Sequence, residues 1–310
     1  MVDNRDFDFI VVGAGIAGAS VAYFLSENHA VLVLEKEDQP GYHTTGRSVA
    51  VHTDAYGPRE VRALCKASAD FIHNPPEGFS DVPLQHSLGL IFVATEEQKA
   101  DMYATLPVVQ ELNPNIREIG LDEVKRRCPV VSTDKLAAAF YDPDTVGLDV
   151  NAIHQGYLRG HKRLNGEIIC KAGVTGMKRE DGQWLVDTSA GLFCAPVVIN
   201  ASGAWADVVA KMAGAREIGI VPKRRTCIII DAPDGVDPSS WPAIIDMHEN
   251  YYFKEDAGKI VASLGDETPD QPHDVQPDDY DVAVMVDRIE NADKRPRDTM
   301  QVGQGQVAFL

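Results

Sequence analysis

The stretch Phe9-Ile-Val-Val-Gly13-Ala-Gly15-Ile-Ala-Gly18 decides the fold, because it joins an apolar run to a helical pattern through three regularly spaced glycines. Residues 8–12 are rich in β-branched side chains and are bounded by glycine, which predicts a fully buried parallel strand. Residues 16–27 have helical spacing, and residues 29–34 form a second apolar run that ends at Glu35. This order of strand, glycine turn, helix and strand is the context in which a Gly-x-Gly-x-x-Gly turn binds a dinucleotide.

Each glycine, and the acid that follows the second strand, has a physical role in that context. Gly13 allows the tight turn, Gly15 leaves room for a pyrophosphate to touch the backbone, and Gly18 lets helix and strand pack closely. The N–H groups at the start of the helix face the phosphates. Glu35 would accept hydrogen bonds from ribose hydroxyls, and it disfavours a 2′-phosphate because two anions would meet.

Two later stretches favour FAD over NAD, which the glycine turn alone does not distinguish. Residues 36–50 form a loop around Gly41 and Gly46, where an NAD-binding fold would continue into another helix. The donors in this loop that suit a pyrophosphate are Thr44, Thr45, Arg47 and Ser48. Residues 195–207 read as a buried strand that ends in small residues and turns into a helix, so that a ligand can approach the backbone there.

Composition and charge exclude several classes of protein. With 310 residues, 44% of them hydrophobic, the chain is large enough for one large domain or two interleaved ones. The 29 Lys and Arg against 47 Asp and Glu give a formal charge of −18, which disfavours nucleic acid and anionic membrane surfaces as partners. The best apolar segment, residues 9–25, is too short to span a membrane, and acids precede it, so we expect a cytoplasmic protein. Five cysteines without a Cys-x-x-Cys pair indicate reduced thiols and no structural metal.

Residues 41–48 and 200–207, Gly-Tyr-His-Thr-Thr-Gly-Arg-Ser and Asn-Ala-Ser-Gly-Ala-Trp-Ala-Asp, resemble signature segments of the D-amino-acid oxidase/dehydrogenase (DAO) superfamily of FAD enzymes. Within it the chain is most similar to the FAD-dependent D-arginine dehydrogenases, over residues 6 to about 290. The supporting segments are 55–57, 61–64, 74–79, 154–160, 222–225 and 273–277. The resemblance implies an α/β fold in which a Rossmann-like (GR2-type) FAD-binding domain is interleaved with an α+β substrate domain built on an antiparallel or mixed sheet.

The implied domain division is 1–80 and 146–220 for FAD binding, 81–145 and 221–295 for substrate, and 296–310 as an atypical tail. In the substrate segments, residues 88–94 and 225–230 read as strands, and residues 96–112 and 121–128 have helical patterns. Residues 151–164 have a helical pattern in the FAD segments. Residues 266–281 carry seven acids and three prolines and read most simply as a solvated loop.

We therefore expect FAD as the cofactor, and no metal. The residues expected at the FAD are Gly13, Gly15, Ile16, Ala17, Gly18, Glu35, Lys36, Thr44, Thr45, Gly46, Arg47, Ser48, Ala50, Val174, Ala201, Gly203 and Trp205.

The substrate pocket implied by the resemblance consists of Thr53, Tyr56, Arg225 and Tyr252. The two phenols would lie near the substrate carboxylate or cover the site, and Arg225 would pair with substrate charge. The alternative for each tyrosine is a half-buried core aromatic with a hydrated hydroxyl, and for Arg225 a surface salt bridge.

Two positions bear on specificity. The carboxylate that holds a D-arginine guanidinium in relatives aligns with Leu90, and an unpaired guanidinium in an apolar pocket costs several kcal/mol. We therefore expect a neutral D-amino acid rather than D-arginine. The family's active-site histidine aligns with Val51, with His52 one place later; a loop histidine such as His52 or His43 is more often a hydrogen-bonding residue than a base.

The expected reaction is oxidation of the Cα–N bond of a D-amino acid to a 2-oxo acid and ammonia, with a quinone or another molecule as electron acceptor. The alternatives are a flavin oxidoreductase of a 2-hydroxy acid, a secondary amine or glycerol 3-phosphate, or a truncated, catalytically impaired homologue. The last alternative arises because residues after Glu290 do not match the family's ending, which supplies a carboxylate-pairing arginine and a cover for the flavin.

Overall fold

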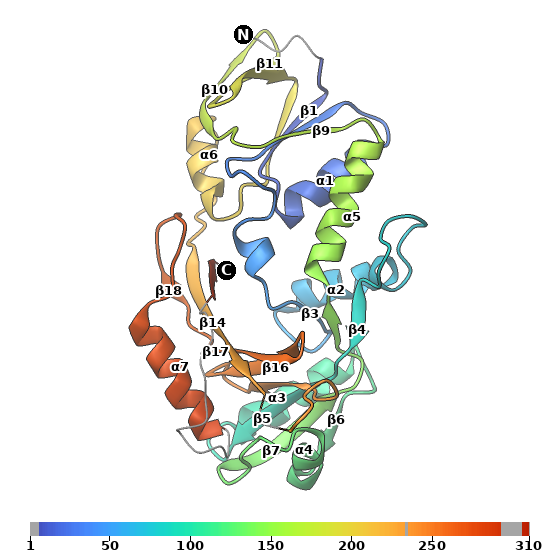
Figure 1. The fold of residues 1–310 in the computed structure, drawn as a ribbon, viewed down its shortest axis with the longest axis vertical. Coiled ribbons are helices and arrows are strands. Elements are labelled where there is room, and N and C mark those ends of the chain that lie inside the picture. The colour runs from blue at the N-terminus through green and yellow to red at the C-terminus, as the bar shows by residue number, and fades with distance from the viewer. Residues whose placement is uncertain (1–5, 233–234, 293–305, 310) are drawn as a thin grey trace.

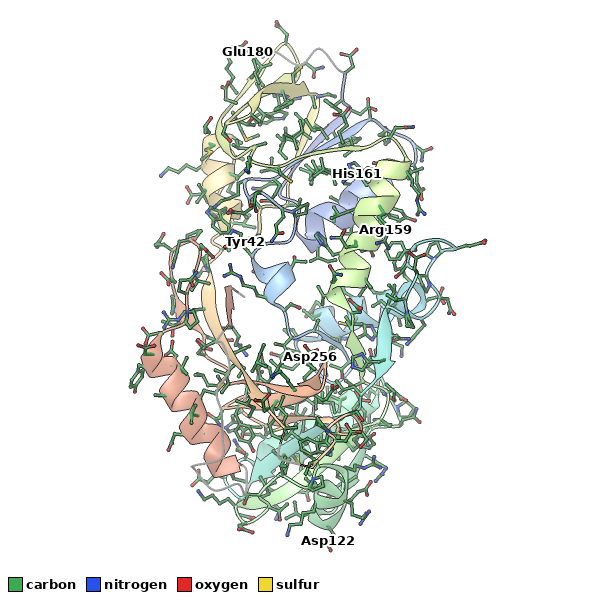
Figure 2. The ribbon with its side chains drawn as sticks, viewed as in Figure 1. Tyr42, Asp122, Arg159, His161, Glu180 and Asp256 are labelled. Atoms are coloured by element: carbon green, nitrogen blue, oxygen red, sulfur yellow. The ribbon has the colours of Figure 1, made fainter. Side chains whose placement is uncertain are left out.

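The computed structural model describes residues 6–232, 235–292 and 306–309. Two halves lie along its long axis, with Glu180 at one end, Asp122 at the other and Tyr42 near the level at which the halves meet (Figures 1 and 2).

The first half is built on a parallel sheet in the order β13-β1-β2-β9. Its elements are β1 (Phe9–Val12), α1 (Ile16–Leu25), β2 (Val31–Leu34), β9 (Glu167–Ile169) and β13 (Val197–Asn200). Val12 pairs with Leu34 on one side and with Asn200 on the other, so the carboxyl ends of three strands meet at one edge. The helix α5 (Val150–Arg163) packs against α1 (Figure 1). The residues that directly follow β1, β2 and β13 therefore face a shared crevice.

A small antiparallel sheet and a short helix complete this half. The sheet consists of β10 (Val174–Glu180), β11 (Gln183–Thr188) and β12 (Gly191–Ala195). The 3₁₀ turn η2 (Gly203–Trp205) leads into α6 (Ala206–Met212), which contacts β10. Another 3₁₀ turn, η1 (Thr44–Arg47), follows β2 in the chain.

The second half is built on a nine-stranded mixed sheet, in which β5 and β15 form a parallel pair and the other pairs are antiparallel. Its strands are β5 (Leu90–Thr95), β6 (Arg117–Ile119), β7 (Leu136–Asp142), β14 (Lys223–Asp231), β15 (Ala243–Asp246), β16 (Tyr252–Asp256), β17 (Lys259–Ser263), β18 (Thr268–Pro269) and β19 (Gln306–Phe309). Its helices are α3 (Lys99–Gln110), α4 (Leu121–Arg127) and α7 (Asp279–Ala292). The chain passes between the halves through a three-stranded sheet of β3 (Val51–His52), β8 (Val146–Leu148) and β4 (Gln85–Ser87), with α2 (Arg59–His73) beside it.

The predicted fold class is confirmed: a Rossmann-like α/β half is interleaved in sequence with a half built on a mixed sheet. The helices expected over 96–112, 121–128 and 151–164 are α3, α4 and α5, and the expected strands over 88–94 and 225–230 are β5 and β14. The division into domains at the stated boundaries stays a prediction. Most of the atypical tail predicted over 296–310 lies outside the described residues; within it, 306–309 form β19, which pairs with β14.

The interpretation of residues 266–281 as a solvated loop is wrong in part. The segment contains β18 and the start of α7, and both Asp266 and Val275 are buried. The Asp266 carboxylate accepts hydrogen bonds from the backbone N–H and the hydroxyl of Thr226, at 2.6 and 2.9 Å. The many acids in this segment suggested that their carboxylates are hydrated, whereas the carboxylate of Asp266 is bonded to Thr226.

Candidate functional site

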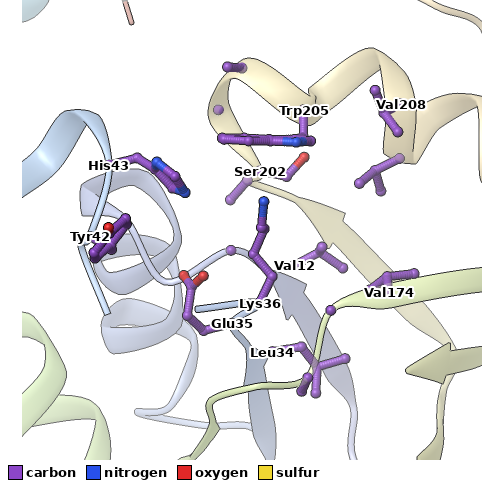
Figure 3. Close-up of a pocket in the computed structure, with 18 of the residues that line it drawn as sticks. Val12, Leu34, Glu35, Lys36, Tyr42, His43, Val174, Ser202, Trp205 and Val208 are labelled. Atoms are coloured by element: carbon purple, nitrogen blue, oxygen red, sulfur yellow. The ribbon is translucent and has the colours of Figure 1, made fainter. Parts of the chain in front are cut away.

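A cavity of about 510 Å³ lies at the carboxyl ends of β1, β2 and β13, where the fold predicts a ligand (Figure 3). Its size is in the range of small-molecule and cofactor sites. The expected cofactor residues that line it are Gly13, Gly15, Glu35, Lys36, Thr44, Thr45, Val174, Ala201, Gly203 and Trp205. Further lining residues that sequence reasoning did not assign are Val12, Leu34, Gly41, Tyr42, His43, Ala172, Gly173, Thr175, Ser189, Ser202, Ala204, Val208, Val209 and Met212.

The other expected cofactor residues are in the described part of the chain but do not line this cavity: Ile16, Ala17, Gly18, Gly46, Arg47, Ser48 and Ala50. Gly18 and Gly46 shape the turns around it, as described below. Contact of each of these residues with FAD stays a prediction.

Close backbone packing explains the three glycines of the first turn. Gly13 has a φ of +102°, and a Cβ on it would lie 2.5 Å from the carbonyl oxygen of Ala201. A Cβ on Gly18 would lie 1.8 Å from the carbonyl oxygen of Gly13. A Cβ on Gly15 would meet only the hydroxyl oxygen of Thr45, at 3.2 Å. Gly13 and Gly18 are thus required by the packing of the turn itself, whereas Gly15 keeps the cavity wall open.

The Glu35 carboxylate is fixed at the edge of the cavity by backbone donors. Its two oxygens accept the N–H of Ala14 at 2.8 Å and the N–H of Glu37 at 2.9 Å, and the residue is only 7% exposed. A carboxylate oxygen can accept more than one hydrogen bond, so lone pairs remain for ribose hydroxyls at the cavity wall. The arrangement agrees with the ribose-binding role expected of this acid.

The loop around η1 folds onto the start of α1. Gly41 has a φ of +76°, and its carbonyl oxygen accepts the N–H of Gly46 at 2.8 Å. The Thr45 hydroxyl oxygen accepts the N–H of Ile16, the first residue of α1, at 2.9 Å. Thr45 therefore connects the loop to the helix terminus that the dinucleotide motif presents to phosphate.

Three side chains from separate segments cover one side of the cavity (Figure 3). The Lys36 ammonium lies 4.1 Å from the ring centre of Trp205, and the ring of His43 lies 4.7 Å from the same ring. His43 also shares a 2.9 Å hydrogen bond with Glu37. Hydrogen bonding to His43 and Lys36 lowers the pKa of Glu37, although burial opposes it, so the carboxylate stays charged at neutral pH.

His154 supports the glycine turn from α5, which sequence reasoning missed. Its Nε2 donates to the carbonyl oxygen of Ala14 at 2.8 Å, and its ring lies against Gly41, where a Cβ would come within 2.8 Å. Burial lowers the pKa of His154, so the ring is neutral at physiological pH. No local pattern marks this residue, because its partner lies 140 positions away.

Three of the four predicted substrate residues lie together, joined by an acid that was not predicted. The Tyr56 hydroxyl donates to Glu249 Oε2 at 2.8 Å, and this oxygen lies 3.9 Å from Arg225 Nη1. The guanidinium carbon of Arg225 lies 6.0 Å from the ring centre of Tyr252. Partial burial of its ring, followed by the bond to Glu249, raises the pKa of Tyr56 to about 12, and burial also raises the pKa of Tyr252.

Arg225 is a buried cation with loose partners. Its side chain is 8% exposed, its Nη2 lies 3.5 Å from Glu267 Oε1, and its Nε has no hydrogen-bond partner among the described residues. The alternative of a surface salt bridge is therefore wrong for Arg225, because its side chain is buried on β14. A buried donor without a partner costs free energy unless a ligand satisfies it, and a planar carboxylate matches a guanidinium best.

The remaining predicted residues occupy different surroundings. Leu90 is buried in the same apolar cluster as Ala55, and Tyr252 packs against this cluster. Thr53 is buried and donates to Asp142 at 2.8 Å, within the second half. His52 hydrogen-bonds the carbonyl oxygen of Cys65 at 2.8 Å, as expected of a hydrogen-bonding loop histidine.

The described residues contain no group of three His, Cys, Asp or Glu side chains that could hold a metal. Over the same residues, no helix has both the length and the apolar character to cross a bilayer.

The donors and acceptors of the cavity fit FAD. The glycine turn and η1 loop supply backbone and hydroxyl groups suited to a pyrophosphate, and Glu35 suits a ribose. Apolar side chains such as Val12, Leu34 and Val174 line the wall on which a flat ring system can pack. When bound, FAD supplies the two-electron chemistry, and the protein supplies position and charge.

Comparisons with known proteins agree with this site. The family profile described as "DAO: FAD dependent oxidoreductase" matches residues 8–293. The chain is 24% identical over 263 residues to mitochondrial dimethylglycine dehydrogenase of Rattus norvegicus, covering 81% of this chain and 30% of the relative. It is 26% identical over 216 residues to L-2-hydroxyglutarate dehydrogenase of Indibacter alkaliphilus, covering 67% of this chain and 53% of the relative. The chain thus spans about a third to a half of the length of these relatives.

The crystal structure of glycine oxidase from Geobacillus kaustophilus superposes with a TM-score of 0.85 at 18% identity, over 99% of this chain and 83% of that one. This similarity shows a shared fold. Together with the profile match over residues 8–293, it establishes that the chain belongs to the DAO family of FAD-dependent oxidoreductases.

Proposed function

We propose that the chain oxidises the Cα–N bond of a neutral D-amino acid by hydride transfer from Cα to FAD. The substrate loses a hydride from Cα and a proton from nitrogen, and water then converts the imino acid to a 2-oxo acid and ammonia. A quinone or another molecule would take the electrons onward. The observation that carries this proposal is Arg225, a buried guanidinium whose Nε has no partner among the described residues.

Arg225 would bind the substrate carboxylate. An ionic, bidentate contact fixes the orientation of the amino acid as well as its position, which aligns Cα for transfer. Tyr252 lies beside the guanidinium, and its phenol is held neutral by the burial that raises its pKa, so it can donate a hydrogen bond to the same carboxylate.

Glu249 favours an amine over a second acid. Its carboxylate lies 3.9 Å from Arg225 and accepts from Tyr56, so a substrate anchored on Arg225 would place its substituents close to a negative charge. An amine or ammonium on Cα is attracted there, whereas a dicarboxylate is repelled. This supports an amino acid over a dicarboxylic hydroxy acid such as the substrate named for the Indibacter relative.

Leu90 supports a neutral side chain. It is buried with apolar neighbours in the cluster that packs against Tyr252, where the D-arginine dehydrogenases that the sequence resembles hold a carboxylate. A guanidinium brought against this cluster would lose its hydration without gaining a partner.

The test is anaerobic bleaching of the bound flavin by compounds that share one side chain. The compounds compared would be D-leucine, L-leucine, N-methyl-D-leucine and the two enantiomers of 2-hydroxyisocaproate. Dimethylglycine and glycerol 3-phosphate would be tested as further candidate substrates. The proposal predicts fastest bleaching with D-leucine. Faster bleaching by a hydroxy acid, by glycerol 3-phosphate or by an N-methylated amine would replace it with the corresponding alternative, and no bleaching by any arm would favour a catalytically impaired homologue.

A further inference from the structure

A short segment of the second half contacts two walls of the FAD cavity at once. Asp274 and Val275 lie between β18 and α7, in the acid-rich stretch of residues 266–281. Asp274 contacts the loop around η1, whereas Val275 is buried against Ala204 of η2. Both contacted segments, the loop at 41–47 and the turn at 203–205, line the cavity.

The contact to the η1 loop uses both oxygens of Asp274. Arg47 Nη2 donates to one oxygen at 2.7 Å, and the Tyr42 hydroxyl donates to the other at 3.2 Å. Arg47 Nη1 also donates to the carbonyl oxygen of Val275 at 3.1 Å, and the guanidinium lies 5.0 Å from the centre of the Tyr42 ring. The Arg47 side chain is 17% exposed, so this ion pair is partly shielded from water on its cationic side. The bond to Arg47 lowers the pKa of Asp274, which keeps the carboxylate charged at neutral pH.

These contacts give Arg47 a different task from the one expected of it. A pyrophosphate donor would be aimed into the cavity, yet the Arg47 side chain bonds to Asp274 and Val275 and does not line the cavity in the described structure. Tyr42, by contrast, lines the cavity and is bonded to the same acid. The loop that carries Thr44 and Thr45 is therefore anchored at both ends by one residue of the other half.

We propose that Asp274 is a positioning residue for the flavin: through Arg47 and Tyr42 it holds the η1 loop, and with Val275 on Ala204 it clamps two walls of the FAD cavity to the half that carries Arg225. Retention of FAD then depends on a residue that does not touch it. The proposal concerns the cofactor and does not depend on which substrate is oxidised.

The test is a double-mutant cycle measured as the dissociation constant of FAD. Apoprotein of the wild type, D274N, R47Q and the double variant would be titrated with FAD, following quenching of flavin fluorescence. D274N and R47Q should each weaken FAD binding by about tenfold or more, because each removes the same charge-assisted contact. The double variant should be no weaker than the weaker single variant, since coupled residues are not additive.

Controls separate this role from general destabilisation. D270N removes one charge from the same stretch and should leave FAD affinity unchanged. Among the described residues, its carboxylate accepts the N–H of Gln271 at 2.7 Å and lies 3.9 Å from His273, away from the η1 loop. D274E, which keeps the charge, should bind FAD more tightly than D274N. If D274N does not fold, Y42F and R47K take its place, because each removes part of the contact and should weaken FAD binding.

Several results would overturn the proposal. Wild-type affinity in D274N, or in both Y42F and R47K, would show that the clamp does not support FAD. Weakening in R47Q but not in D274N would mean that Arg47 acts on the cofactor directly. The proposal also fails if the losses of FAD affinity in D274N and R47Q add up in the double variant, or if D270N loses as much affinity as D274N. It fails equally if the wild-type chain binds no FAD.

Discussion

Replacement of Gly18 by alanine should disable the FAD site through the backbone. The new Cβ would lie 1.8 Å from the carbonyl oxygen of Gly13, whereas real Cβ atoms essentially never approach within 3.0 Å, so helix and turn must separate by about 1.2 Å. Gly13 has little room to retreat, because the space beside it is filled: even a Cβ on Gly13 would lie 2.5 Å from the carbonyl oxygen of Ala201. The strain must therefore be taken up by the hydrogen bonds that hold the turn.

Two such bonds are at risk. The Gly13 N–H donates to the carbonyl oxygen of Leu34 at 2.8 Å, and the Ala14 N–H donates to the Glu35 carboxylate at the same distance. Losing one neutral and one charge-assisted bond costs about 2–4 kcal/mol. We expect a lower melting temperature and an FAD affinity reduced by more than about tenfold.

The assay is thermal unfolding together with FAD titration of the apoprotein, with G176A as the matched control. Gly176 lies on β10, where a Cβ would meet only ordinary contacts at 3.7 Å, and alanine there should leave both quantities close to the wild type. If G18A behaves like G176A, the close packing of helix on turn does not determine the site and the reasoning fails.

Four further changes test separate parts of the account. G15V should abolish flavin retention in the purified protein, because its branched side chain enters the space beside Thr45 that Gly15 leaves open; normal flavin occupancy would contradict this. L90E should raise the ratio of kcat/KM for D-arginine over D-leucine, and L90Q, of similar shape but neutral, should not. E249Q should raise kcat/KM for D-glutamate relative to D-glutamine by about fivefold to tenfold, as a partly exposed charge is worth about 1 kcal/mol; an unchanged ratio would remove Glu249 from specificity. Because burial raises the pKa of Tyr56 to about 12, its phenol stays neutral below about pH 11, and Y56F should keep every limb of the wild-type pH profile of flavin reduction in that range.

The parts of the site that follow from sequence are those formed by neighbours in the chain. Gly13, Gly18 and Glu35 lie within one strand–helix–strand unit, and their spacing carries the geometry of the turn. The η1 loop follows directly, and its glycines and threonines predict a turn with donors before any tertiary contact is known.

The parts that could not be predicted depend on distant residues. Glu249 meets Tyr56 across 193 positions, His154 meets Ala14 across 140, and Asp274 meets Arg47 across 227. In a stretch rich in acids, the neighbouring sequence does not show which carboxylates are solvated and which make tertiary contacts. The same cause led to the misinterpretation of residues 266–281 as a wholly solvated loop.

We propose above all that the Cα–H bond of a D-amino acid breaks at the flavin while the substrate is anchored in this chain. The most direct measurement is the rate of anaerobic flavin bleaching at 450 nm by D-leucine, compared with D-leucine that carries deuterium at Cα. Both compounds should bleach the flavin, and the deuterated one should do so more slowly. Absence of bleaching, or bleaching at the same rate by both compounds, would contradict the proposal.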